Sequence, residues 1–121
     1  MEPVPDIDEL TWLFEDGPVG AEGWQREFPH TEVAFRTTRA GVAVSLALAI
    51  DYEDARLVIS GAAAPEVDLS LHDVQAVEVE RLHGAEVLVL RFRPSAALEP
   101  LRLVLKPTLS LRWSIGFHVS A

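Results

Sequence analysis

The chain has 121 residues, 49% of them hydrophobic, which is enough for one domain with an ordinary core and too little for two. Its formal net charge of −9, from 19 acids and 10 bases, opposes nonspecific binding to nucleic acid or to an anionic membrane. The absence of cysteine excludes disulfide frameworks, thiolate metal sites and cysteine nucleophiles. We therefore predict a single domain over residues 1–121, in which residues 1–31 pack on a sheet formed by residues 32–119.

The N-terminal segment, residues 1–31, is predicted to contain a short helix and then a loop. Apolar side chains recur at helical spacing between residues 6 and 16: Ile7, Leu10, Leu13 and Phe14. Asp6 and Glu9 have the spacing of a capping box, and Gly17 favours a stop. The alternation around Trp12 would also suit a short strand, which is the alternative interpretation of this segment.

Residues 32–119 are predicted to form an antiparallel β core of seven or eight strands. Apolar side chains alternate with polar or small ones in short runs, and turn residues follow about every eight to twelve positions. This pattern is typical of an all-β protein, either a small β-sandwich or a partly closed barrel. The short helix would plug one open end or lie against an edge.

The longest alternating run lies between Val42 and Tyr52, where every second residue is large and apolar. Its other face holds only small residues: Ala43, Ser45, Ala47 and Ala49. We therefore predict a central strand that is covered on both sides. A helix through residues 46–60 is the alternative, because alanine and leucine favour helices. The acids that follow are predicted to form a solvated turn rather than a calcium site: Asp51, Glu53 and Asp54.

The clearest hairpin joins residues 74–82 to residues 85–93 through a two-residue loop, His83 and Gly84. This loop length sets the register and divides the side chains between two faces. The buried face, where Val77 opposes Leu90 and Val79 opposes Leu88, is predicted to hold Val77, Val79, Leu88, Leu90 and Phe92. The wetter face, with Glu78 diagonal to Arg91, is predicted to hold Glu78, Glu80, Arg91 and Arg93.

The sequence contains no pattern that indicates catalysis. The four histidines lie in separate segments without ligand spacing, and neither a phosphate-binding glycine loop nor a GxSxG motif occurs. Ser70, His72 and Asp73 are close in sequence, but alternation places Ser70 and His72 on the polar side of a strand with no oxyanion donor. We therefore expect a non-enzymatic protein without a cofactor or a metal.

The acids are concentrated in the first half of the chain. Residues 1–54 hold 12 acids and three arginines, whereas residues 55–121 hold seven acids and seven bases. This asymmetry favours an acidic docking surface for a protein partner of basic character. The predicted contact residues are Glu15, Asp16, Glu22, Trp24, Glu27 and Phe28. Five bases in the second half of the chain alternate with apolar residues: Arg91, Arg93, Arg102, Lys106 and Arg112. This alternation favours an ordinary solvent-exposed face, and a basic patch that recognises an acidic partner is the alternative.

These observations favour a non-catalytic protein-interaction module of bacterial type. Small acidic all-β domains occur among bacterial inhibitors such as immunity proteins, although no residue pattern assigns this chain to them. The acidic start and the lack of a membrane-length apolar run predict a cytoplasmic location, with neither nucleic acid nor membrane as partner. A homodimer is a further interpretation.

The alternative function is a small-molecule-binding β-barrel. Its mouth would be lined by aromatic side chains that supply a large contact area at low entropic cost: Trp12, Trp24, Phe28 and Trp113.

Overall fold

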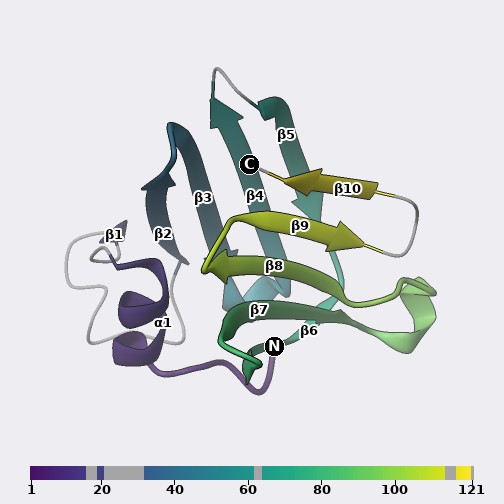
Figure 1. The fold of residues 1–121 in the computed structure, drawn as a ribbon. Helices are drawn as coiled ribbons and strands as arrows, with labels where there is room; N and C mark the ends of the chain where they lie inside the picture. The colour runs from purple at the N-terminus through teal and green to yellow at the C-terminus, as the bar shows by residue number, and fades with distance from the viewer. Residues whose placement is uncertain (16–18, 21–31, 62–63, 114–116, 121) are drawn as a thin grey trace.

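Two five-stranded antiparallel sheets pack face to face in the computed structural model (Figure 1). The structure describes residues 1–15, 19–20, 32–61, 64–113 and 117–120. Sheet A consists of β1 (Val19–Gly20), β2 (Glu32–Arg39), β3 (Val42–Ala49), β4 (Asp54–Gly61) and β5 (Ala64–Leu71). Sheet B consists of β6 (Val74–Leu82), β7 (Ala85–Phe92), β8 (Leu101–Lys106), β9 (Ser110–Trp113) and β10 (Phe117–Ser120).

Each sheet is a meander, because strands that follow one another in the chain are also hydrogen-bonded neighbours. Two residues between β5 and β6 carry the chain from sheet A to sheet B. The strands of one sheet run across those of the other, and the sheets remain separate rather than closing into one barrel (Figure 1). Of the two architectures predicted, the protein adopts the β-sandwich.

Seven or eight strands are predicted, and the alternating runs correspond to the eight strands β2 through β9; β1 and β10 are additional. Residues 46–60 contain the end of β3, the 3-10 turn η1 (Ile50–Tyr52) and most of β4, so the strand interpretation is confirmed over the helical one. A second 3-10 turn, η2 (Pro94–Ala96), lies in the connection between β7 and β8.

Two tight hairpins are built alike. In each two-residue loop both residues have positive φ: Ala40 (51°) and Gly41 (78°) between β2 and β3, and His83 (52°) and Gly84 (78°) between β6 and β7. The predicted register of the second hairpin is confirmed, since Val77 pairs with Leu90 and Val79 pairs with Leu88.

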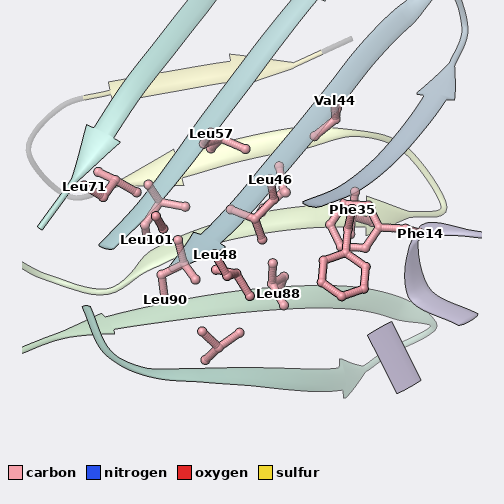
Figure 2. Packing of buried hydrophobic residues seen from close by; sticks show 14 of the residues in the cluster. Phe14, Phe35, Val44, Leu46, Leu48, Leu57, Leu71, Leu88, Leu90 and Leu101 are labelled. Carbon is pink, nitrogen blue, oxygen red and sulfur yellow. The ribbon is translucent and has the colours of Figure 1, made fainter. Parts of the chain in front are cut away.

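The core lies between the sheets and is filled by large aliphatic side chains from both inner faces. Figure 2 shows Leu46 and Leu48 of β3 pointing toward Leu88 and Leu90 of β7. Alternation explains this arrangement, because every second residue of each strand points to the same face.

The helix α1 (Ile7–Phe14) closes one side of the sandwich beside β2 (Figure 1). Leu10, Leu13 and Phe14 are buried, and the Phe14 ring stacks on Phe35 of β2 with centroids 5.6 Å apart. The predicted capping box is wrong: Asp6 is the N-cap, but its side chain makes no capping hydrogen bond. Glu9 forms an ion pair with Arg81 of β6 instead, at 3.2 Å.

The chain before the helix runs along the outer edge of β6. The Glu2 amide donates a hydrogen bond to the Gln75 carbonyl at 2.7 Å, and the Val77 amide donates to the Pro3 carbonyl at 2.9 Å. Residues 1–5 therefore cover part of an edge strand that would otherwise present unpaired backbone groups.

Three predicted burial states are wrong. Tyr52 was expected on the inner face of β3, but β3 ends at Ala49 and η1 turns the Tyr52 side chain out, where it is 77% exposed. The outer face of β3 was expected to be covered, yet Ala43 is exposed and Ala47 is only half-buried, because no described element packs over them. Val79 is half-buried rather than buried.

Candidate functional site

Most of the bases in the described part of the chain are paired internally. Seven of the nine described bases form an ion pair with a carboxylate, and Arg36 and Arg112 have no such partner among the residues that the structure describes. Arg91 of β7 and Arg102 of β8 share Glu80, at 3.5 and 2.6 Å, and Arg91 also lies 2.9 Å from Glu78. The late bases therefore do not make a patch of unpaired positive charge, and of that set only Arg112 lacks a carboxylate partner among the described residues.

The predicted docking residues fall largely outside the described part of the chain. Glu15 is described, whereas Asp16, Glu22, Trp24, Glu27 and Phe28 lie outside the described residues. Glu15 directly follows α1 and has φ 63°.

Glu15 is engaged within the molecule. Its carboxylate lies 2.9 Å from Lys106 of β8 and 3.3 Å from Arg39 of β2, so it joins the two sheets. The hydrogen bond from Lys106, supported by the charges of Lys106 and Arg39, lowers the pKa of Glu15 below its ordinary value. The position of Glu15 is therefore better suited to holding the helix end than to meeting a partner.

The predicted aromatic mouth is not assembled by the two tryptophans that the structure describes. Trp12 is 50% exposed on α1, and Lys106 at the end of β8 lies 4.1 Å from its ring centroid. Trp113 pairs with Leu101 at the start of β8 and stacks on Phe92. The two rings thus lie near opposite ends of β8 and do not share an opening.

An acidic groove lies where the N-terminal segment meets the connection between β3 and β4. This N-terminal groove has a volume of about 810 Å³. Its lining comprises apolar and proline residues, three acids and one ion pair: Met1, Pro3, Val4, Pro5 and Ile50; Glu2, Asp6 and Asp51; Glu53 with Arg93.

The ion pair in the groove also joins the two sheets. Glu53 precedes β4, and its carboxylate accepts a 2.7 Å hydrogen bond from Arg93, which follows β7. This bond lowers the pKa of Glu53 below its ordinary value, against the opposing effect of burial. The N-terminal ammonium lies 3.5 Å from the same carboxylate. Glu53 is thus paired, and the exposed carboxylates of Glu2 and Asp6 give the groove net negative charge.

Sequence reasoning missed this groove, although it placed the acids in the correct half of the chain. Glu2 and Asp6 are separated from Asp51 by more than forty residues, and only the pairing of residues 2–3 with β6 brings them together. The one available signal was the extended Pro3–Pro5 segment, which is unsuited to a helix and suited to lying along an edge strand.

The described residues do not assemble a catalytic triad or a metal centre. His72 Nδ1 lies 2.9 Å from Asp54 Oδ1, which resembles half of a triad, but Ser70 and His72 make no mutual hydrogen bond. Within the described ranges, no three histidine or carboxylate side chains gather as metal ligands.

No family model, curated protein or solved structure matches the chain. Among the helices that the structure describes, none is both long enough and apolar enough to cross a membrane.

Proposed function

We propose that this protein is a non-catalytic interaction module whose N-terminal groove binds a basic segment of a protein partner. The observation that carries the proposal is that two carboxylates without an ion-pair partner among the described residues stand together in one groove, whereas other such acids, including Glu66 and Glu99, lie outside it. Glu2 and Asp6 are exposed, form no ion pair among the described residues, and line the same groove. A basic partner would supply the missing countercharge.

The composition of the groove suits a peptide segment with both apolar and cationic side chains. Pro3, Val4 and Pro5 provide apolar surface that is at least partly exposed, and the carboxylates of Glu2 and Asp6 stand beside it. Apolar contact supplies affinity in such interfaces, whereas the surrounding charge steers association and selects the partner.

Tyr52 supplies an exposed aromatic anchor next to the groove. It is 77% exposed and lies in the chain between Asp51 and Glu53, which both line the groove. Tyrosine is among the residues that most often dominate binding energy at protein interfaces, because it buries a large ring and retains a polar end.

The proposed docking region still lies in the acidic first half of the chain, but it is centred on the groove rather than on the segment that begins at Glu15. Glu15 is assigned to internal ion pairs, and the groove acids take its place. Contacts by Asp16, Glu22, Trp24, Glu27 and Phe28 stay predictions. One role for such a module is that of an inhibitor, as in immunity proteins, which would act on a partner with a basic surface.

The test compares two double variants that remove the same charge from different places. Glu2→Gln with Asp6→Asn neutralises the groove, and Glu66→Gln with Glu99→Gln neutralises two acids that are also exposed and form no ion pair among the described residues. Tagged proteins are incubated with lysate of the source cells, and retained proteins are quantified by mass spectrometry.

We expect a stoichiometric basic protein to be retained by the wild type and the control and lost from the groove variant. Its retention should fall as salt rises from about 0.1 M to about 1 M, where the Debye length shrinks from about 10 Å to about 3 Å. Equal retention by both variants at every salt concentration would reject the proposal.

A further inference from the structure

A second hollow lies on the outer face of sheet A, where Ala49 of β3 and Asp54 of β4 stand at the two ends of the connection that contains η1. We name it the alanine pocket: Ala47 and Ala49 of β3 are its floor, and Glu32, Asp54, Arg56 and His72 stand around them. Its volume is about 280 Å³. A hollow of this size is below the usual range for drug-sized ligands, roughly 300–1,000 Å³, and suits one side chain.

The strand register places two carboxylates on either side of the floor. Glu32 of β2 pairs with Ala49, and Ala49 pairs with Asp54 of β4, so the three form one row across the sheet. In the next row, Ala47 lies opposite Ala34 and Arg56. The methyl group of Ala49 therefore lies between Glu32 and Asp54, and Ala47 extends the floor into the next row.

The positive charge at the pocket is already neutralised. Arg56 donates two hydrogen bonds to Asp68, at 3.0 and 2.8 Å, and this pairing lowers the pKa of Asp68. His72 Nδ1 lies 2.9 Å from Asp54. Glu32 is exposed and forms no ion pair among the described residues. The pocket thus combines an apolar floor with net negative walls.

We propose that the alanine pocket binds a single arginine side chain of the partner. An occupant needs an apolar stem to cover Ala47 and Ala49 and a cationic head to meet Glu32 and Asp54. Arginine meets both requirements, and its planar guanidinium presents five donors that reach acceptors on two walls at once.

The inference rests on the proposed function, because it identifies a second feature of the same basic partner. Residues 49–54 contribute to both hollows: Asp51 and Glu53 line the groove, and Ala49 and Asp54 line the pocket. A partner that covers exposed Tyr52 would therefore reach both hollows.

The test uses acetyl-Gly-Arg-Gly-amide and its neutral isostere acetyl-Gly-citrulline-Gly-amide as probes of the full chain. Amide and methyl resonances are followed by nuclear magnetic resonance during titration. We expect shifts at Ala47, Ala49 and Glu32 on adding the arginine peptide, and at least tenfold weaker binding of the citrulline peptide, because its neutral ureido group keeps N–H donors but loses the cationic charge that strengthens hydrogen bonds to carboxylates.

Variants then locate the probe. Glu32→Gln should weaken arginine binding about tenfold, whereas Glu66→Gln, an exposed acid at the far end of the same face, should leave it unchanged. Ala47→Leu should abolish binding by filling the pocket. Because position 47 is half-buried on the outer face, thermal unfolding of this variant serves to confirm that it still folds.

Equal binding of the arginine and citrulline peptides, or no effect of Glu32→Gln, would overturn the pocket while leaving groove-dependent capture of a partner intact. The opposite result, arginine binding at the pocket with capture indifferent to Glu2 and Asp6, would reject the proposed function and retain the pocket. A lysine peptide that binds as tightly as the arginine peptide would overturn the assignment to arginine.

Discussion

The two sheets have similar aliphatic inner faces and very different outer faces. On sheet B, Val89 at the centre of β7 is buried, and the residues paired with it across the sheet are Glu78 and Arg102. On sheet A, the centre of β3 is lined by Ala43, Ser45, Ala47 and Ala49, which remain exposed or half-buried. One face is thus covered by its own side chains, and the other is open.

Long charged side chains explain the covered face. Glu80 bridges Arg91 and Arg102, and Arg91 reaches Glu78, so the ion pairs hold four long side chains around Val89. Their aliphatic stems remove apolar surface from water while their charged ends stay wet. Alternation of charged and apolar residues therefore does not by itself predict an open face.

The largest expected effect comes from truncating one buried leucine on each inner face, which tests whether both sheets contribute to the same core. Leu46→Ala in β3 and Leu90→Ala in β7 each remove a fully buried side chain from the shared core. We expect each to lower the free energy of unfolding by about 2–5 kcal/mol. Chemical denaturation measures both. A loss below about 1 kcal/mol in either variant would mean that the two sheets do not share one core.

The contrast between the two outer faces predicts a smaller effect, which is measured by making the same valine-to-alanine substitution once in each sheet. Val89→Ala should cost about 2 kcal/mol, since it removes two buried carbon atoms and leaves space beneath the ion pairs. Val58→Ala, at a half-buried position on the outer face of sheet A, should cost less than about 1 kcal/mol. Equal losses by denaturation would show that the two outer faces are covered alike.

Local sequence patterns predicted much of the fold because they concern neighbouring residues. Alternation located β2 through β9, and the His83–Gly84 loop gave the correct pairing of Val77 with Leu90. The end of β3 was misplaced because alternation continues to Tyr52, while the connection to β4 requires residues 50–53 to leave the sheet.

The candidate site was less accessible from sequence, because it depends on contacts between distant segments. Composition indicated an acidic first half, but not which acids are paired internally. Glu15 illustrates the difference: it was predicted to meet a partner, and its neighbours are Arg39 and Lys106, far along the chain. The sequence pattern does not distinguish Glu32 from other acids, because its proposed role depends on lying in one row with Ala49 and Asp54.

The pH dependence tests the ion pairs that join the two sheets. The folded-state pKa values of Glu15 and Glu53 are lowered by Lys106 and Arg93, so the contribution of these pairs is present above the ordinary pKa of 4.5 and is lost as pH falls below it. We expect the wild-type Tm to fall more steeply from about pH 5 to about pH 3 than the Tm of the Glu15→Gln, Glu53→Gln variant. At pH 7 the variant should be the less stable of the two. Parallel Tm profiles would contradict a role for these pairs in joining the sheets.

The smallest expected effect concerns two arginines on the outer face of sheet B, of which one has a carboxylate partner and the other has none among the described residues. Arg102 and Arg112 are direct cross-strand partners on β8 and β9, yet only Arg102 has a carboxylate, Glu80 at 2.6 Å, among the described residues. Arg102→Gln should lower the free energy of unfolding by up to about 1 kcal/mol, the usual range for a partly exposed pair.

Arg112→Gln should instead be neutral or stabilise the protein by a few tenths of a kcal/mol, because like charges directly opposite each other repel. Denaturation of the two variants in low salt and again in about 1 M salt provides the measurement, and the difference between them should shrink when the charges are screened. If Arg112→Gln costs as much as Arg102→Gln, then the ion pairs with Glu80 do not distinguish the two arginines. The covering of Val89 would then have to come from aliphatic stems alone.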